Sequence, residues 1–399
     1  MKGQAFGAAL LVIQPHSSHC TMSTLFTPTR RQFNRMALGA GALVAAPVLR
    51  AQDNRIVLGQ SAAFTGPAAA LGTEFLVGAK VYFDQLNAKG GVNGRQVVVH
   101  NLDDGYEPDR CAANTEKLIK EDVFSLFGYI GTPTSVVALP MAVQAKMPFV
   151  APFTGAMGLR EPLKREAFHL RASYDDETAL IVNQLFNLGL TKVAVFYQDD
   201  AYGKAGLSGV TKALTAKGAK TVAEATVKRN SVDVAEAVGK LAKSGANAIV
   251  QISAYKSCAA FIREARKAGF GGQFFNVSFV GTQALADELG KDGAGVVVSQ
   301  VMPSPYNASR PITREFTAAA KKVNAHINYS SMEGYLAAKM IAEGMRRASG
   351  KLTRDGLIAG LESIDEDFGG YRVSFGPNDH VASNFVELSM LSGDGRVRT

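Results

Sequence analysis

Cysteine and histidine are scarce in this chain of 399 residues, which has three cysteines and six histidines. Their spacing matches no Cys/His metal motif, so we expect neither a metal ion nor another cofactor. Cys111 and Cys258 are far apart in the sequence, and each lies in a segment of helical periodicity. This predicts two separate buried thiols and no structural disulfide. His169 and His380 are interpreted as structural residues.

Sequence signatures of common enzyme classes are also missing. The chain has no Gly-x-Gly-x-x-Gly dinucleotide turn, no phosphate-binding loop and no Gly-x-Ser-x-Gly nucleophile elbow. We therefore predict a binding protein and not an enzyme.

The net charge of +8 at first favours an acidic partner. Residues 1–51, however, contain five cations and no acid, and removing them lowers the net charge to +3. The five cations are Lys2, Arg30, Arg31, Arg35 and Arg50. No Lys/Arg cluster remains that would form a nucleic-acid surface, so we expect no nucleic-acid partner.

The first 51 residues have the order of parts of an export leader. Residues 29–35 resemble the twin-arginine export signal, an apolar stretch follows at 36–48, and Ala51 offers a small residue for cleavage. The stretch is too short to span a bilayer as a helix. The alternatives are a basic tail beside a buried helix, and a start at Met22 with residues 1–21 not made. We predict removal of residues 1–51 and a periplasmic location.

Short apolar runs alternate with longer segments of helical periodicity from residue 56 onward. The pattern runs to residue 150, then restarts near residue 178 and continues to residue 277. Such alternation predicts an α/β fold with two doubly wound parallel-sheet units in succession. A later helical segment at 331–348 and a hairpin-like tail at 371–391 must return to these units.

The most informative stretch is residues 127–135, Phe-Gly-Tyr-Ile-Gly-Thr-Pro-Thr-Ser. It predicts a strand, a tight glycine turn and a helix start, at the edge of the sheet where parallel α/β folds bind ligands. The hydroxyls of Thr132, Thr134 and Ser135, together with free N–H groups of the helix, suit a small anion such as a carboxylate. The alternative is an ordinary helix N-cap.

Five further segments carry a family resemblance, and they occur in order along the chain: residues 63–67, 87–94, 103–104, 201–203 and 261–269. Together they resemble the leucine/isoleucine/valine-binding group of periplasmic binding proteins, the solute receptors of ATP-binding-cassette importers. The resemblance implies two lobes joined by three crossovers that close on a ligand like a clamshell. Lobe 1 would comprise residues 53–172 and 302–373, and lobe 2 residues 173–301 and 374–399.

The resemblance also assigns roles to single residues. Thr132 corresponds to the hydroxyl that holds the ligand carboxylate, and Phe153, Thr154 and Gly155 to the segment that completes the same pocket. Leu71 falls where the family often has an aromatic wall, and Tyr202 matches a tyrosine that closes over the ligand. Read alone, Leu71 is a core residue, and for Tyr202 packing and binding are equal alternatives. The remaining predicted binding residues are Tyr129, Thr134, Tyr255 and Ser278.

One departure from the family bears on the ligand. Amino-acid binders place an acid near Ser278 to pair with the ligand ammonium, and a buried ammonium without such a partner is costly. Glu333, Asp199 and Asp200 are possible substitutes. We therefore expect a small carboxylate-bearing ligand, either an amino acid or an organic or aromatic acid. A carboxylic acid without an amine is favoured, and an aromatic one would suit the aromatic residues around the predicted site. These are Phe64, Tyr129, Phe153, Tyr202 and Phe279.

The expected partner is the membrane permease of an ATP-binding-cassette importer, with the protein acting as a monomer. A periplasmic sensor that reports to a signalling system is the alternative, because the same fold and pocket serve both roles. A neighbouring permease gene would separate the two.

Overall fold

The computed structural model describes residues 54–399. The predictions for the leader lie outside the described residues, including the twin arginines at 30 and 31, the cleavage at Ala51 and the alternative start at Met22. Between residues 54 and 399, no helix combines the length and the apolar character that crossing a membrane requires.

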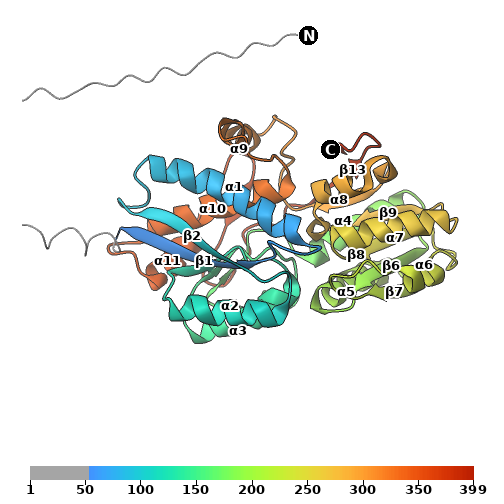
Figure 1. Ribbon diagram of the computed structural model, residues 1–399, viewed down its shortest axis with the longest axis horizontal. Helices are drawn as coiled ribbons and strands as arrows, with labels where there is room; N and C mark the ends of the chain where they lie inside the picture. Colours follow the sequence, from blue (N-terminus) through green and yellow to red (C-terminus); the bar gives the residue numbers. More distant parts are fainter. Residues whose placement is uncertain (1–53) are drawn as a thin grey trace, which may run out of the picture. The chain divides into compact units, whose positions relative to one another are not determined.

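The first sheet consists of five parallel strands in the order β2-β1-β3-β4-β5. The strands are β1 (Arg55–Ala62), β2 (Gln96–Asp103), β3 (Ser125–Phe127), β4 (Phe149–Val150) and β5 (Ala167–Phe168). Figure 1 shows α1 (Ala69–Ala88) and α10 (Tyr329–Arg347) on one side of β1 and β2, and α2 (Pro108–Lys120) and α3 (Thr132–Gln144) on the other. Helices thus cover both faces, which explains why the strands read as apolar runs.

Helices α1 and α10 approach each other unusually closely. A Cβ atom on Gly78 would lie 1.7 Å from the Ser331 carbonyl oxygen, and one on Gly334 would lie 1.9 Å from the Phe75 carbonyl oxygen. Only glycine allows backbones to approach this closely. The two helices therefore form a tightly packed layer, although residues 89–328 separate them in the sequence.

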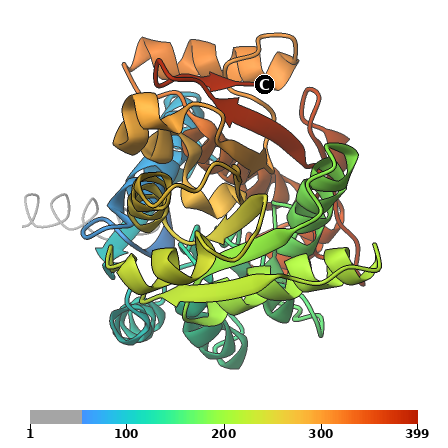
Figure 2. The same cartoon turned by 90° about the vertical axis from the view of Figure 1, so that its right-hand side faces the viewer.

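The second sheet has seven strands in the order β14-β13-β10-β9-β8-β6-β7. Its parallel strands are β6 (Val193–Gln198), β7 (Ala223–Val227), β8 (Ala248–Ile252), β9 (Gln273–Asn276) and β10 (Val297–Gln300). Strands β13 (Glu387–Leu391) and β14 (Val397–Arg398) add an antiparallel edge beyond β10. Figure 2 shows these last strands in red beside the yellow and green ones.

Further helices connect or cover the two sheets. Helix α4 (Tyr174–Asn187) precedes the first strand of the second sheet. The helices between the strands of that sheet are α5 (Ala201–Thr215), α6 (Ala235–Leu241), α7 (Tyr255–Lys267) and α8 (Thr282–Leu289). Helices α9 (Pro311–Lys322) and α11 (Arg354–Glu362) pack with α1 and α10, and a small hairpin of β11 (Asp365–Asp367) and β12 (Arg372–Ser374) follows. Cys111 in α2 and Cys258 in α7 are free, buried thiols, as predicted.

The chain passes between the two sheets three times, at residues 169–173, 301–310 and 375–386. The first and third passages are joined by hydrogen bonds from the His169 amide to the His380 carbonyl (2.8 Å) and from the Ala382 amide to the His169 carbonyl (2.8 Å). The predicted fold, two parallel-sheet units joined by three crossovers, is confirmed. The residue limits of the two lobes remain a prediction.

Candidate functional site

The glycine turn before α3 is built as the sequence predicts. Gly131 has φ 99° and ψ 158°, and α3 begins at the next residue, Thr132. The Thr132 Oγ1 lies 2.7 Å from the Thr154 Oγ1, and both residues are buried. The first-turn N–H groups of α3 have no partners within the helix. Two hydroxyls and a helix N-terminus therefore converge on one point, which is an arrangement that attracts a small anion.

A short parallel bridge brings the second part of this pocket into place. The Phe153 amide donates to the Tyr129 carbonyl (2.7 Å), and the Gly131 amide donates to the Phe153 carbonyl (3.2 Å). The Tyr174 amide then donates to the Gly155 carbonyl (2.8 Å). The predicted residues Phe153, Thr154 and Gly155 thus lie beside the turn at Gly131.

Aromatic rings from both sheets meet in front of this turn. The ring of Phe279, which follows β9, lies 4.6 Å from Tyr202, 5.8 Å from Phe153 and 5.8 Å from Tyr106, measured between centroids. Tyr174 lies 5.4 Å from Tyr202. All five side chains are fully buried. They lie between the part of the protein built on the first sheet (the first half) and the part built on the second sheet (the second half). Together they are called the aromatic cluster.

Leu71 also lies at this boundary. Its Cδ2 would be 2.5 Å from a Cβ on Gly281, which belongs to the loop after Phe279. Leu71 of the first half thus touches the loop that carries Phe279 in the second half. Leu71 can therefore pack in the core and also lie at the ligand site.

A small cavity of about 10 Å³ lies next to the aromatic cluster, between the two halves. Its lining residues come from both sheets: Phe153, Arg171, Ser278, Thr282, Gln300, Val301, Met302, Tyr329, Ser330 and Glu333. This volume is close to that of a single water probe. An amino acid or an organic acid is therefore larger than this cavity.

An ion pair forms one wall of the cavity. Arg171 binds Glu333 through two bonds, Nε to Oε1 at 2.8 Å and Nη2 to Oε2 at 2.6 Å, and both side chains are almost fully buried. The guanidinium also lies over the Phe153 ring, 4.0 Å from its centroid. Burial alone lowers the pKa of Arg171, but the Glu333 carboxylate reverses this, so the pKa of Arg171 is raised and its guanidinium stays ionised. Glu333 therefore faces the cavity with its charge already balanced.

Glu177 is a second buried acid near the site, and the sequence reasoning missed it. It accepts hydrogen bonds from the Ser278 amide (2.7 Å), the Ser278 Oγ (3.0 Å) and the Ser299 Oγ (2.5 Å). Burial raises its pKa above the usual value, and Arg171 opposes the rise. A signal was available, because Glu177 shares the buried face of α4 with Tyr174, Thr178 and Ile181.

A polar contact crosses from the β2–α2 loop of the first half to the second half. The Glu107 carboxylate accepts from Arg229 Nη2 (2.8 Å) and from Asn230 Nδ2 (2.7 Å), and Asn230 Nδ2 also lies 3.0 Å from the Gly105 carbonyl. Arg229 Nη1 also donates to Asp200 (3.2 Å). Sequence alone could not reveal the bonds from Arg229 and Asn230 to the β2–α2 loop, because their partners are at least 122 positions away.

Tyr106 lies beside this contact and is another site residue that the sequence did not indicate. It has φ 65°, which is uncommon for a residue other than glycine. Its amide donates to Asp104 (2.8 Å), and its hydroxyl accepts from Gln198 Nε2 (3.3 Å) in the second half. Burial raises the pKa of Asp104 to about 6. Tyr106 thus places its ring against Phe279 at the expense of local backbone strain.

Some predicted site residues point elsewhere. Tyr129 lies against Phe149, with its hydroxyl 3.1 Å from the Thr115 Oγ1, and is not part of the aromatic cluster. Thr134 donates its hydroxyl to the carbonyls of Ile130 (2.5 Å) and Gly131 (3.0 Å), so this hydroxyl closes the turn.

The remaining predicted residues lie at the edge of the site. Tyr255 is buried at the start of α7. Asp200 caps α5 by accepting from the Tyr202 amide (2.9 Å), and Asp199 is exposed. Neither aspartate lines the cavity between the halves.

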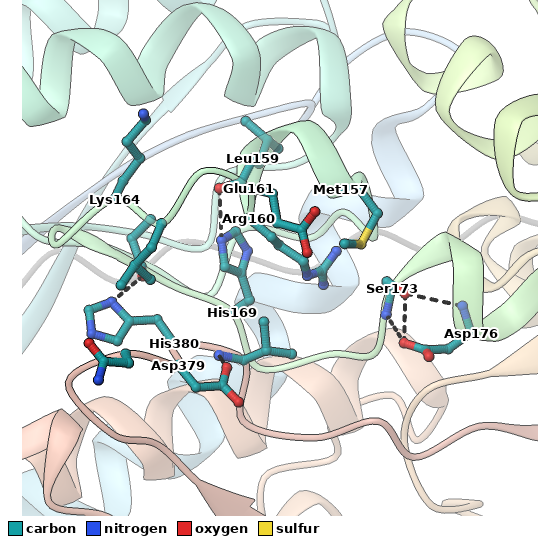
Figure 3. A pocket seen from close by; sticks show the side chains of 14 residues that line it. Met157, Leu159, Arg160, Glu161, Lys164, His169, Ser173, Asp176, Asp379 and His380 are labelled. Carbon is teal, nitrogen blue, oxygen red and sulfur yellow. Dashed lines mark hydrogen bonds between the residues drawn. The ribbon is translucent and has the colours of Figure 1, made fainter.

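A larger hollow of about 470 Å³ lies between the first and third crossovers (Figure 3). His169 and His380 line it, and their ring nitrogens lie 3.2 Å from the Leu159 carbonyl and 3.0 Å from the Ala167 carbonyl, respectively. His380 also stacks on Phe168 at 3.9 Å. Both contacts agree with the structural role predicted for these histidines. No predicted ligand-binding residue lines this hollow.

The comparison with protein-family models decides the family. The model described as "Periplasmic binding protein" matches residues 55–395. The chain belongs to the periplasmic binding protein family. The resemblance drawn from the sequence is therefore confirmed. This binding protein is not an enzyme, and its family places it in the periplasm or outside the cell.

Individual relatives agree with the family. The chain is 25% identical over 390 residues to Leu/Ile/Val-binding protein homolog 7 of Brucella melitensis. This match covers 91% of this chain and 95% of the relative. A solved structure of a possible leucine/isoleucine/valine-binding protein from Rhodopirellula baltica is 32% identical, with a TM-score of 0.82. That match covers 86% of this chain and 95% of the other.

Two more distant solved structures share the fold of this binding protein. One is a branched-chain amino acid ABC transporter protein of Thermus thermophilus with bound valine, at 16% identity and a TM-score of 0.77. It covers 86% of this chain and 94% of the other. The second is a solute-binding protein of an ABC transporter of R. palustris in complex with benzoate, at 18% identity and a TM-score of 0.76, covering 85% and 94%.

Proposed function

We propose that this binding protein captures a small carboxylic acid between its two halves and delivers it to an ATP-binding-cassette permease. One observation carries the proposal: the buried hydroxyls of Thr132 and Thr154 lie 2.7 Å apart at the N-terminus of α3. An ionised carboxylate there would replace the hydroxyl–hydroxyl contact by two charge-assisted hydrogen bonds and would benefit from the helix dipole. Closure would use the three crossovers, between lobes of residues 53–172 with 302–373 and 173–301 with 374–399.

The ligand, in this proposal, lacks an α-amino group. Glu333 is bound by Arg171, so an ammonium approaching Glu333 would also meet the guanidinium. Glu177 lies behind Ser278 and does not line the cavity. A neutral hydroxyl at Ser278 gives an ammonium no charge compensation, and an uncompensated buried charge costs several kcal/mol. The family fold itself accommodates either class, since it is found with valine in one protein and with benzoate in another.

Calorimetry with a matched pair of compounds tests this function. Leucine and 4-methylpentanoate have the same carbon skeleton, and only leucine carries the amine. We expect 4-methylpentanoate to bind and leucine to bind at least tenfold more weakly. Tight binding of leucine together with no binding of 4-methylpentanoate would show that an acid in the site does receive an ammonium.

Thr132 supplies a direct test of the carboxylate site. Thr132→Val removes one hydrogen bond to a charged group, so we expect affinity for a bound acid to fall by about tenfold to a hundredfold. Thr132→Ser keeps the hydroxyl and serves as the control, with affinity near that of the wild type. Equal affinities for the Val and Ser variants would remove Thr132 from the site.

We also propose that residues 1–51 form a leader of the twin-arginine type, because Arg30 and Arg31 precede an apolar stretch and Ala51. N-terminal sequencing of periplasmic protein checks this, with a start near residue 52 expected. A Lys-Lys replacement of the two arginines should retain the full-length chain in the cytoplasm, and unchanged export would exclude this route.

A further inference from the structure

Arg171 brings an unused hydrogen-bond donor to the cavity between the two halves. Two of its nitrogens, Nε and Nη2, bind Glu333. The third, Nη1, has no hydrogen-bond partner among the described residues, although the side chain is only 1% exposed. A guanidinium nitrogen can donate but not accept. The cavity therefore has a strong donor on the Arg171 side that the protein itself leaves unmatched, and buried donors are normally matched.

Ser278 offers the opposite polarity on the other side of the same cavity. Its Oγ is 3.0 Å from Glu177 Oε1, while Glu177 Oε2 accepts from the Ser278 amide and from the Ser299 Oγ. Burial raises the pKa of Glu177, but its three hydrogen bonds and the charge of Arg171 favour the ionised form, and an ionised carboxylate can only accept hydrogen bonds. The Ser278 hydroxyl proton is thus directed at Glu177. Its oxygen lone pairs remain available as an acceptor for a ligand.

The two sides together favour one kind of ligand group. An ammonium has no lone pair for Arg171 Nη1 and would be repelled by the guanidinium. A second carboxylate has no proton for Ser278 and would add a negative charge close to Glu177 and Glu333. A hydroxyl accepts and donates at once, and it brings no charge into a region where Arg171 and Glu333 already balance each other.

We propose that the ligand is a carboxylic acid with a hydroxyl group remote from its carboxylate. The hydroxyl accepts from Arg171 Nη1 and donates to Ser278 Oγ, while the carboxylate binds at Thr132 and Thr154. The proposal rests on the proposed function for the carboxylate end and adds a specificity determinant at the opposite end of the ligand.

Two pairs of acids that differ only in this hydroxyl provide the test. The aromatic pair is benzoate and 4-hydroxybenzoate, and the flexible pair is hexanoate and 6-hydroxyhexanoate. Calorimetry on the wild-type protein is expected to show that the hydroxy acid binds at least tenfold more tightly in one pair or both, since one of its hydrogen bonds involves a charged group. Equal or weaker binding of the hydroxy acid in both pairs would overturn the proposal.

Two serine variants distinguish ligand recognition from support of Glu177. Ser278→Ala and Ser299→Ala each remove one hydroxyl that donates to Glu177, but only Ser278 lines the cavity. We expect Ser278→Ala to lose the tenfold preference for the hydroxy acid within each pair. Ser299→Ala should keep the preference. A preference that survives in Ser278→Ala, or disappears equally in both variants, contradicts the assignment.

The same measurements separate this proposal from the function on which it rests. If unsubstituted acids bind and the hydroxyl adds nothing, the carboxylate receptor stands and the hydroxyl site is wrong. If none of the four acids binds, the carboxylate function is itself overturned.

Discussion

Replacing Glu333 by leucine is expected to destabilise the protein by about 3–5 kcal/mol, because Arg171 would remain as a buried charge without its partner. The pair is bidentate and almost fully buried, so the leucine variant leaves two Arg171 nitrogens without their acceptor. Urea unfolding of the ligand-free protein measures the change in the free energy of unfolding. A fall of this size is among the larger effects of single substitutions.

Two further variants complete this experiment. In the control variant Glu116→Leu, an exposed i,i+4 pair with Lys120 is broken, and no measurable change in stability is expected. The double variant Arg171→Met/Glu333→Leu removes both charges and should recover most of the loss. Equal stabilities of Glu333→Leu and Glu116→Leu would show that burial of the Arg171–Glu333 pair is not energetically important.

The double variant should also change the pH dependence of stability. Arg171 opposes the rise that burial causes in the pKa of Glu177, so without Arg171 this pKa rises further above 4.5. A group whose pKa is raised in the folded state contributes stability at low pH that is lost as the pH rises through that pKa. The stability that the double variant loses relative to the wild type should therefore be larger at pH 7 than at pH 5. Parallel pH profiles for the two proteins would contradict this.

Gly131→Ala is the second change with a large expected effect. Its φ of 99° with ψ 158° is a conformation that non-glycine residues essentially do not adopt, and a Cβ there would lie 2.2 Å from the Tyr106 ring. Tyr106 cannot easily move, because its ring is fully buried between Gly131 and Phe279. Backbone strain and overpacking each cost about 1–3 kcal/mol, so we expect a loss of about 2–6 kcal/mol.

Gly94→Ala is the matched control for Gly131→Ala. Gly94 also has positive φ, 76°, but a Cβ at this position meets nothing within 4 Å. The stability lost by Gly94→Ala therefore measures the cost of backbone strain without a steric clash. Gly131→Ala should be the less stable of the two and should also lose affinity for acids, because the first turn of α3 shifts. The same stability and affinity in both variants would indicate that the contact with Tyr106 is not constraining.

The fold was largely predictable because its signals are local. Strands buried on both faces appear as apolar runs, and the run at residues 193–197 forms most of β6, Val193–Gln198. The predicted helix at 331–348 corresponds to α10, Tyr329–Arg347, shifted by a residue or two at its ends. The partner of the tail was not predictable, because the pairing of β13 with β10 depends on contacts about 90 residues apart.

The site was predictable only in part. Thr132, Thr154 and Phe153 are marked by a local glycine turn and by the family pattern, and the structure brings them together. The Arg171–Glu333 pair joins residues 162 positions apart, and nothing in either local sequence indicates the other. Tyr106 likewise becomes a site residue only because Phe279 from the second half packs on it. These roles depend on contacts between the halves, and the periodicity of a single segment gives no information about such contacts.

The pairing of β13 with β10 also constrains the order in which this protein folds during synthesis. When β10 has emerged from the ribosome, its partner is still to be made, and the residues between them form α9, α10 and α11, which pack with α1. An unpaired strand edge invites pairing with another chain. Nascent chains that stall between residues 300 and 387 should therefore be the most aggregation-prone, and chaperone binding is expected to be needed longest in this interval.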